Sequence, residues 1–275
     1  MVTLMKPEVY LREELKAVLA GRSPFDFFKM VEGDIYRDKE GRRTLRFIAE
    51  GKRYFVKYHQ GVGWREIWKN LLQARLPIIS ARNEWQAIQT LHRVGVDTMT
   101  LAGYGETGLN PAQRRSFVVT DELTHTMSLE YLGEQWQHNA PSLKSKRLLI
   151  DKLADMTRRM HHAGLNHRDY YLCHVLLTET FAQTNTISEQ TQLFLIDLHR
   201  AQQRKRVPAR WLIKDLASLY FSAHAVSLTK RDKLRFIRAY SGLSLRFCLT
   251  HDRRFWHKVQ KRRDALMAKW QRQHD

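Results

Sequence analysis

Two aspartates and a lysine in this sequence have the side-chain chemistry that phosphoryl transfer requires. Asp169 lies in a polar segment, and Asp197 ends a short apolar run. One carboxylate of such a pair can orient and deprotonate an acceptor hydroxyl, while the other can hold Mg²⁺ against the phosphate oxygens of a nucleotide. Lys57 lies inside another apolar run and, as a compact cation, can bind the α- and β-phosphates. We therefore predict Asp169 as the catalytic base, Asp197 as a metal ligand and Lys57 as the clamp on the phosphates of ATP.

The residues around Asp169 have the order of a kinase catalytic loop, in which His-Arg-Asp precedes four residues and an asparagine. His167 and Arg168 supply the first two positions, so we assign them to the catalytic group, and His174 stands at the last position. We assign His174 to the metal site; because Mg²⁺ prefers oxygen ligands, a structural or phosphate-facing role is the alternative. The alternatives for the two aspartates are turn capping for Asp169 and the N-cap of a helix for Asp197.

Lys57 is expected to pair with a glutamate on a helix that packs against its sheet. Its run, residues 54–57, resembles the kinase strand that carries the phosphate-binding lysine. Glu84 is the predicted partner because it begins a helix, and Glu66 is the rival. The alternative for Lys57 is a surface lysine on an edge strand.

The glycine-rich loop of kinases is missing at the position where the chain order would place it. Residues 33–44 contain only Gly33 and Gly41 as glycines. Backbone N–H groups of such a loop normally cover the phosphates. We therefore predict that Arg42 and Arg43 supplement phosphate binding.

The N-terminal part of the chain predicts an antiparallel sheet. Short β-prone runs at 43–48 and 53–59 flank a turn that contains Gly51, which is typical of a hairpin. Alternation along the second run places Tyr54 and Val56 on one face and Lys57 on the other.

Two helices are predicted to follow, over residues 64–75 and 80–94. The first carries Trp64 and Trp68 among basic residues, so we expect its apolar side to pack on the core. An interfacial helix at a membrane surface is the alternative, because tryptophan and basic residues suit that position.

The second half of the chain reads as mainly helical, with a long helix ended by Gly164 and a basic amphipathic helix over 251–275. Asp215 begins another helix, and we interpret it as structural support for the catalytic loop. The predicted fold class is α+β, in two protein-kinase-like lobes. The N-terminal lobe is residues 1–122, with the sheet, and the larger helical C-terminal lobe is residues 123–275.

The composition indicates a partner with many negative charges. The net charge is +19, the two cysteines form no disulfide framework, and neither a signal peptide nor a membrane-spanning run is expected. Nucleic acid would explain the charge, but the sequence carries no zinc spacing, RNA-recognition signature or basic region with heptads. We therefore expect no nucleic-acid partner.

The segment between Asp197 and Asp215 is basic throughout and contains no acidic residue. In kinases the stretch after the metal-binding aspartate borders the acceptor site, and arginines bind carboxylates and phosphates bidentately. The alternative is a solvated basic loop, and Arg200 could instead brace the active site. The predicted acceptor-binding residues are Arg200, Arg204, Lys205 and Arg206.

Several runs together resemble the lipopolysaccharide core heptose(I) kinases of Gram-negative bacteria. They are residues 42–47, 95–99, 164–169 with 173–174, and 196–202. The resemblance covers nearly the whole chain and fades toward the C-terminus. One departure is Tyr170, which stands beside Asp169 where close relatives are expected to have cysteine, so that positioning of the acceptor could differ.

The resemblance implies ATP- and Mg²⁺-dependent phosphorylation of the first heptose of the lipopolysaccharide inner core, at its 4-hydroxyl. The acceptor would be the lipid A-core glycolipid, met by a cytoplasmic enzyme that is peripheral at the inner membrane. Members of the family associate with acyl carrier protein, and the basic surface would permit the same here. The alternatives are a protein (tyrosine) kinase-like enzyme and a kinase for another core sugar.

Overall fold

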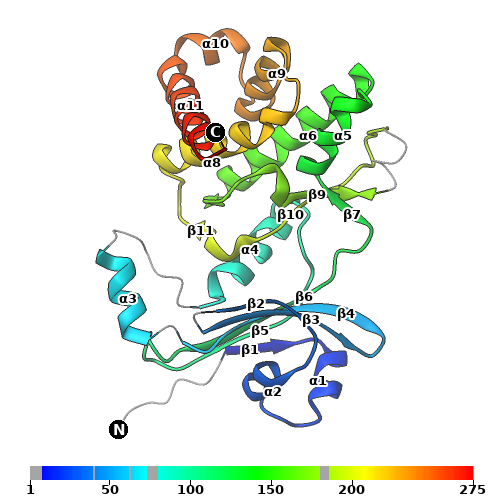
Figure 1. Ribbon diagram of the computed structural model, residues 1–275, viewed down its shortest axis with the longest axis vertical. Coiled ribbons are helices and arrows are strands. Elements are labelled where there is room, and N and C mark those ends of the chain that lie inside the picture. The colour runs from blue at the N-terminus through cyan, green and yellow to red at the C-terminus, as the bar shows by residue number, and fades with distance from the viewer. Residues whose placement is uncertain (1–7, 40, 62, 73–79, 180–185, 275) are drawn as a thin grey trace. The chain divides into compact units, whose positions relative to one another are not determined.

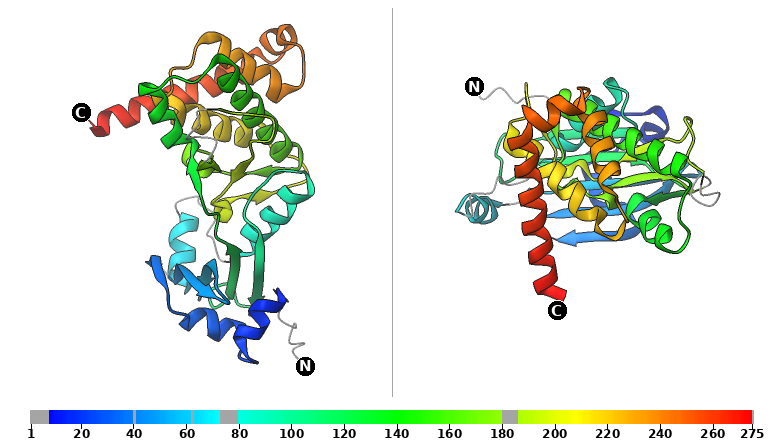
Figure 2. Two further views of the ribbon diagram at one scale, coloured as in Figure 1. Left: turned by 90° about the vertical axis from the view of Figure 1, so that its right-hand side faces the viewer. Right: turned by 90° about the horizontal axis from the view of Figure 1, so that it is seen from above.

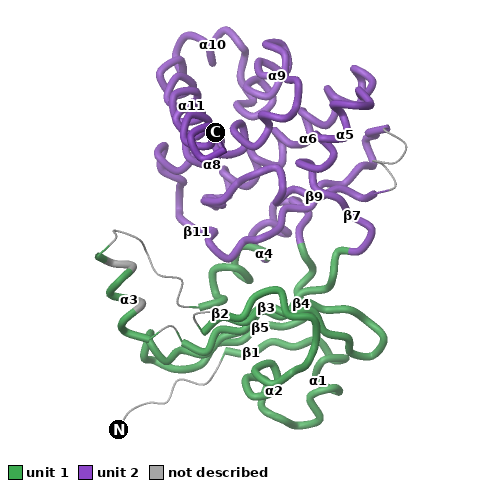
Figure 3. The backbone as a smooth tube through the Cα atoms, in the orientation of Figure 1, with its two compact units in different colours: residues 1–88, 99–123 green, residues 89–98, 124–275 purple. Residues whose placement is uncertain are grey.

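The chain forms two compact units, which Figure 3 shows in different colours. The computed structural model describes residues 8–39, 41–61, 63–72, 80–179 and 186–274. Unit 1 comprises Met1–Ile88 and Met99–Leu123, and unit 2 comprises Gln89–Thr98 and Thr124–Asp275. The predicted lobes were each continuous in sequence, whereas the segment Gln89–Thr98 belongs to unit 2.

Unit 1 is built on a six-stranded antiparallel sheet with strand order β1-β5-β6-β4-β3-β2 (Figure 1). The strands are β1 (Glu8–Leu11), β2 (Asp34–Lys39), β3 (Arg42–Ala49), β4 (Lys52–His59), β5 (Leu101–Thr107) and β6 (Arg115–Asp121). The helices that begin in this unit are α1 (Glu13–Leu19), α2 (Pro24–Met30), α3 (Gly63–Leu72) and α4 (Arg82–Arg93).

The predicted hairpin is formed by β3 and β4, with Ala49 opposite Lys52 at the turn. Its turn residues Glu50 and Gly51 have φ values of 49° and 70°, the conformation that two-residue hairpin turns favour. Tyr54 and Val56 are buried on one face of β4, and Lys57 lies on the other face. The buried face packs against α1 and α2, whose Leu15, Phe25 and Phe28 join its apolar cluster. The lysine is therefore held on a strand whose opposite face is fixed by the core.

Helix α3 buries only part of its apolar side. Ile67 is buried, but Trp64 is 52% exposed, Trp68 is 61% exposed and Leu72 is 86% exposed. Packing of the whole apolar side on the core, which the sequence favoured, is therefore not found for these side chains. Their exposure agrees better with the alternative of an interfacial helix.

Unit 2 is mainly helical, with short strands between the helices (Figure 1). Its α-helices are α5 (Leu129–His138), α6 (Leu143–His162), α8 (Ala209–Ser222), α9 (Lys230–Ser241), α10 (Leu245–Thr250) and α11 (Arg253–His274). Its strands are β7 (Thr126–Ser128), β8 (Leu165–Asn166), β9 (Val175–Thr178), β10 (Leu193–Leu195) and β11 (Gln202–Gln203). They form the sheets β10-β9-β7 and β11-β8. The α+β fold class is as predicted.

Helix α11 is the basic amphipathic helix predicted at the C-terminus. Val259 is buried in a cluster with Leu216 and Ala217 of α8, and Phe255 and Trp256 pack against that cluster. The C-terminal part of α11 extends away from the other helices of unit 2 (Figure 2). No helix in the described part of the chain is long and apolar enough to cross a membrane.

Candidate active site

In unit 1, Lys57 pairs with Glu84. Lys57 Nζ lies 2.7 Å from Glu84 Oε1, and the Glu84 side chain is only 2% exposed. Burial of the glutamate makes this a fixed contact between β4 and α4, because a buried carboxylate is costly without a charged partner. The predicted pairing is therefore confirmed, in preference to Glu66. The role of Lys57 at ATP phosphates stays a prediction.

The arginines predicted to supplement phosphate binding lie at the start of β3. Arg42 is opposite His59 in the hairpin. Arg43 donates through Nη1 to the carbonyl oxygens of Lys29 (2.8 Å) and Val31 (3.0 Å). Arg43 therefore holds the segment after α2, and it would have to give up these bonds to reach a phosphate. The nucleotide-binding role of both arginines stays a prediction.

In unit 2, the backbone of the catalytic loop is held by Asp215, which is fully buried at the middle of α8. Its carboxylate accepts hydrogen bonds from the backbone N–H groups of His167 (2.7 Å) and Arg168 (2.9 Å). Charge-assisted bonds of this kind are among the stronger ones in proteins. The interpretation of Asp215 as a structural support is therefore confirmed.

Gly164 allows the chain to enter this loop next to β11. Its φ is +79°, and a Cβ atom there would overlap the carbonyl oxygen of Arg204. The Arg204 N–H donates to the Gly164 carbonyl at 2.9 Å. Only glycine permits both this φ and this close approach without strain.

Arg168 and Asp197 both have left-handed backbone conformations, with φ values of 74° and 59°. Such values cost of order 1 kcal/mol or more for residues with a Cβ and persist where the surroundings impose them. The bonds from Asp215 impose this conformation at Arg168. At both positions the strained backbone sets the direction of a charged side chain.

His167 connects the two segments that carry the aspartates. It is completely buried and donates from Nε2 to the carbonyl oxygen of Ile196 at 2.9 Å. Burial lowers the pKa of His167 below its ordinary value, so the ring is neutral at pH 7. His167 is therefore a positioning residue within the predicted catalytic group.

Asp169 is surrounded by cations. Arg200 Nη1 donates to both carboxylate oxygens, at 2.9 and 2.8 Å, and Lys214 Nζ lies 3.9 Å from Oδ1. Arg200 thus contacts the predicted base rather than Asp197. Arg200 takes one acceptor site on each carboxylate oxygen, so an acceptor hydroxyl would share an oxygen of Asp169 with this arginine.

Asp197 lies between two histidines. His199 donates from Nδ1 to Asp197 Oδ1 at 2.6 Å, and His174 Nε2 is 3.6 Å from Oδ2. His174 also donates from Nδ1 to the carbonyl oxygen of Asp169 at 2.7 Å. His174 therefore bridges the two predicted reactive aspartates.

The protonation of His174 bears on its predicted metal role. Burial opposes its protonation, but contacts with Cys173, the Asp169 carbonyl and Asp197 outweigh burial and raise its pKa to about 9. An imidazolium has no lone pair to offer a metal, since both ring nitrogens carry protons. The bond from His174 Nδ1 to the Asp169 carbonyl and the contact with Asp197 fit the structural alternative, in which His174 orients Asp197, and its assignment to the metal site stays a prediction.

Asp197 fits a magnesium ion that is held mainly by nucleotide phosphates. Within the described residues, no three His, Cys, Asp or Glu side chains come together to hold a metal by themselves. Mg²⁺ in phosphoryl-transfer sites usually takes one or two carboxylates, with substrate phosphates and water as its other ligands. A single carboxylate such as Asp197 is compatible with that arrangement.

Tyr170 does not face the acceptor side of Asp169. It is fully buried, and its hydroxyl lies 2.7 Å from Thr157 Oγ1 on α6. An effect of Tyr170 on acceptor positioning would therefore act through the core, and it stays a prediction. Tyr170 fills the core behind the loop.

The basic segment after Asp197 divides into bound and exposed residues. Arg204 is partly buried and donates to the side-chain oxygens of Asn166 and Gln202. Lys205 and Arg206 are exposed. The acceptor-binding role of all three stays a prediction.

Sequence reasoning did not assign His199 or Lys214 to the site. His199 lies two residues after Asp197, and Lys214 directly precedes Asp215. Both are thus adjacent to residues that were assigned, and that adjacency is the signal that could have found them. Their contacts with Asp197 and Asp169 depend on backbone geometry that sequence spacing does not supply.

Comparison with known proteins gives consistent matches over nearly the whole chain. Residues 26–240 match the lipopolysaccharide kinase (Kdo/WaaP) family. The chain is 46% identical over 265 residues to the lipopolysaccharide core heptose(I) kinase WaaP of Pseudomonas aeruginosa, covering 96% of this chain and 98% of that protein. It is 44% identical over 264 residues to WaaP of Escherichia coli K12, again covering 96% and 98%. The predicted resemblance is confirmed.

A solved structure gives the same result for the fold. The structure described as WaaP in complex with acyl carrier protein matches with a TM-score of 0.81 and 42% sequence identity. The match covers 94% of this chain and 99% of that chain.

Asp169→Asn should reduce phosphate transfer by a factor of about 10² to 10⁴, because the amide cannot accept the hydroxyl proton. The amide keeps the size of the side chain, so ATP affinity measured by calorimetry should change little. Wild-type turnover in the variant would show that Asp169 is not the base.

Proposed function

This chain belongs to the lipopolysaccharide kinase (Kdo/WaaP) family, and we propose that it transfers the γ-phosphate of ATP to the 4-hydroxyl of heptose I in the lipopolysaccharide inner core. The chain is a phosphotransferase of lipopolysaccharide core biosynthesis. The observation that carries the proposal is the linkage of Asp169 and Asp197 through His167 and His174 in unit 2.

In the proposed reaction, Asp169 accepts the proton of the heptose 4-hydroxyl. The hydroxyl oxygen forms a bond to the γ-phosphorus, the bond from that phosphorus to the β,γ-bridging oxygen breaks, and ADP leaves. Arg200 holds the Asp169 carboxylate in place through its bonds to both oxygens. Lys57, oriented by Glu84, binds the α- and β-phosphates, with Arg42 and Arg43 as further phosphate contacts.

We propose Mg²⁺ as the metal of this reaction, with Asp197 as its protein ligand. When bound, the ion would neutralise negative charge that develops on the phosphate groups. His199 and His174 keep the Asp197 carboxylate oriented toward that position.

Asp197→Ala should abolish the Mg²⁺-dependent part of ATP binding, because the ion loses its protein carboxylate. Calorimetric titrations of ATP with and without Mg²⁺ give this difference directly. Asp264→Ala, which removes an exposed aspartate of α11, is the matched control and should retain the Mg²⁺ dependence. Unchanged affinity of Asp197→Ala for Mg·ATP would exclude the assigned role.

The acceptor is proposed to meet unit 2 through Arg200, Arg204, Lys205 and Arg206. Acidic sugars next to the target heptose carry carboxylates, and lipid A carries phosphates. Guanidinium groups bind both kinds of group bidentately. A net charge of +19 also favours encounter with such a polyanionic glycolipid.

Because the acceptor is lipid-anchored, we propose that the enzyme works as a peripheral protein at the cytoplasmic face of the inner membrane. The exposed Trp64 and Trp68 of α3, with Arg65 and Lys69 between and beside them, form a surface of the kind that enters a headgroup region.

An acceptor panel tests the proposed reaction. Purified chain with Mg·ATP should phosphorylate dephosphorylated core lipopolysaccharide but neither a generic protein substrate nor DNA, and NMR of the product should locate the new phosphate on the heptose 4-oxygen. Trp68→Ser should slow the reaction on vesicle-embedded acceptor and leave the delipidated acceptor unaffected. Transfer to protein, or to another core sugar, would replace this function with one of its alternatives.

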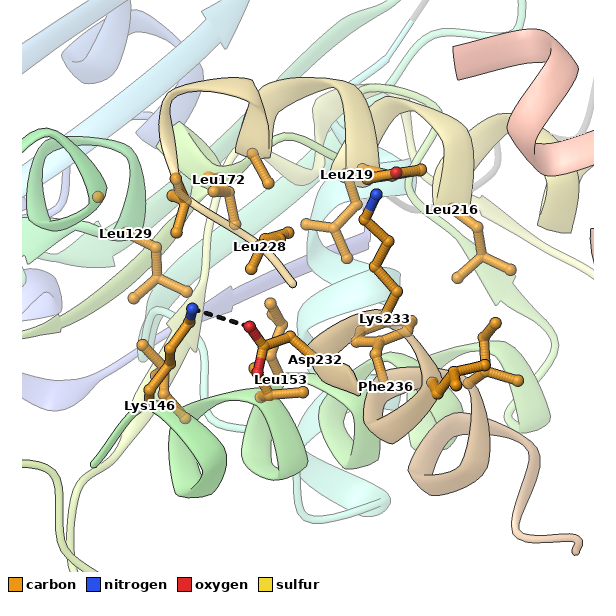
Figure 4. A pocket seen from close by; sticks show the side chains of 18 of the residues that line it. Leu129, Lys146, Leu153, Leu172, Leu216, Leu219, Leu228, Asp232, Lys233 and Phe236 are labelled. Atoms are coloured by element: carbon orange, nitrogen blue, oxygen red, sulfur yellow. Dashed lines mark ion pairs between the residues drawn. The ribbon is translucent and has the colours of Figure 1, made fainter. Parts of the chain in front are cut away.

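We also propose acyl carrier protein as a partner of this chain, as the solved complex of its relative suggests. Unit 2 contains a cavity of about 360 Å³, within the size range of ligand sites (Figure 4). It is lined mostly by apolar side chains of α5, α6, α8, α9 and α11, including Leu129, Leu153 and Leu219, and Lys146 and Asp232 form a 2.8 Å ion pair at its wall. An apolar cavity of this size suits the acyl chain that such a carrier brings.

Hexadecanoyl acyl carrier protein should bind the wild-type chain at least tenfold more tightly than the unacylated carrier, since each buried methylene contributes roughly 0.8 kcal/mol. Leu153→Trp fills the cavity and should abolish this preference, whereas Leu143→Trp changes an exposed leucine of the same helix and should retain it. Calorimetry measures all the affinities. Equal binding of both carriers to the wild type would disprove the role of the cavity.

A further inference from the structure

Cationic side chains of unit 2 gather around Trp211, in the first turn of α8. The guanidinium carbons of Arg168, Arg210 and Arg204 lie 5.3, 5.4 and 5.7 Å from the centre of its ring. Lys214 Nζ lies 5.8 Å from the same point. These residues come from the catalytic loop, the segment after β11 and α8, and together they are called the Trp211 cluster.

The positive charge of the Trp211 cluster is only partly balanced by the surrounding protein. Arg168 is only 9% exposed, yet its Nε has no hydrogen-bond acceptor among the described residues, and the same is true of the buried Trp211 Nε1. Burial and then the nearby Arg200 lower the pKa of Arg168, and together with Arg204 they outweigh Asp169 and Asp215, which raise it. Buried charges are normally paired. The cluster therefore has the composition of an anion-binding site.

The nearby carboxylates are already engaged. Asp215 accepts the two backbone N–H groups of the catalytic loop, and Asp169 accepts two bonds from Arg200. The side-chain partners of Arg204 are the neutral Asn166 and Gln202. Asp169 and Asp215 offset part of the charge of Arg168 and Lys214, but these two carboxylates face the four cations of the cluster and also Arg200.

The backbone of α8 adds to the attraction for an anion. The helix starts at Ala209 after Pro208, whose side chain caps none of the first N–H groups. Unpaired N–H groups and the helix dipole favour negative charge at such an end. Trp211 and Arg210 both belong to this first turn of α8, so the helix end favours an anion near the same side chains.

The Trp211 cluster lies next to the predicted base. Lys214 belongs to the cluster and is also 3.9 Å from Asp169 Oδ1. A group bound by the cluster would therefore be close to the hydroxyl that Asp169 deprotonates. It would belong to the acceptor rather than to the nucleotide, whose phosphates are assigned to Lys57 and the Asp197 metal.

We propose that the Trp211 cluster binds one anionic group of the acceptor, a carboxylate or a phosphate, and thereby sets the position of the neighbouring hydroxyl at Asp169. This rests on the proposed function, because it names the part of the acceptor that the site recognises. Arg168, Arg204, Arg210 and Lys214 supply the charge, and Trp211 holds their side chains together by cation–π contact. An acceptor without this anion is a poor substrate.

Arg210→Gln tests the proposal with little risk to folding, because Arg210 is exposed. The variant should raise KM for intact core lipopolysaccharide about tenfold, the effect of one lost charge-assisted hydrogen bond, with KM for ATP unchanged. Arg210→Lys should recover part of the loss. Arg246→Gln, an exposed arginine of α10, is the matched control and should behave as wild type.

Modified acceptors identify the anion and separate recognition from structure. Acceptor with its sugar carboxylates reduced to alcohols, and acceptor stripped of lipid A phosphates, are each assayed with wild type and Arg210→Gln. Wild type and Arg210→Gln should have the same KM for the acceptor that lacks the recognised anion. Equal KM on the carboxylate-reduced acceptor identifies a sugar carboxylate, and equal KM on the phosphate-free acceptor identifies a lipid A phosphate. Equal KM of variant and wild type on the intact acceptor, or the same fold loss on all three acceptors, would overturn the proposal.

Inorganic phosphate is a direct probe of the cluster. It should compete with intact acceptor in the wild type and do so less well in Trp211→Leu, while leaving KM for ATP unchanged. Competition with ATP alone would count against the site. If the wild type phosphorylates no lipopolysaccharide, the proposed function is wrong. If the wild type is active and the cluster variants have unchanged KM for the acceptor, only the inference about the Trp211 cluster is wrong.

Discussion

The catalytic part of unit 2 depends on the buried carboxylate of Asp215. This group accepts the backbone N–H bonds of His167 and Arg168, at 2.7 and 2.9 Å. The two sides need each other, because a buried carboxylate and a buried amide are each costly without a partner. The bonds hold the loop in a conformation that includes the left-handed Arg168, which the chain would otherwise avoid. The backbone position of the following residue, Asp169, is thereby fixed.

The same helix that supplies Asp215 also supplies the charged surroundings of the base. On α8, Trp211 lies one turn before Asp215, and Lys214 directly precedes Asp215. From the other side, His167 bonds to the carbonyl of Ile196, just before Asp197. A displacement of α8 would therefore disturb the loop, the cations around Asp169 and, through His167, the segment that carries Asp197, the proposed metal ligand.

Charge is the second constraint on this protein. A chain of net charge +19 repels itself, and several of its cations lie close together near Asp169 instead of being spread over the surface. Such an arrangement is unfavourable until an anion binds, and it gives strong, short-range attraction for one that does. This favours a polyanionic acceptor over a neutral one.

The sequence by itself determined the hairpin and its inward face, because alternation along β4 is a local property of the chain. It also predicted two contacts from residue type and order. A lysine on a strand and a glutamate at the start of a later helix favoured the pairing of Lys57 with Glu84. An aspartate on a helix after the loop favoured support of the loop by Asp215. Only the tertiary structure decided that Arg200 binds Asp169, that Tyr170 points into the core, that the tryptophans of α3 are exposed and that arginines from separate segments meet at Trp211. Each of these depends on which way a side chain points after distant segments have packed. That direction is set by long-range contacts and by strained backbone angles, and neither is encoded in the spacing of nearby residues.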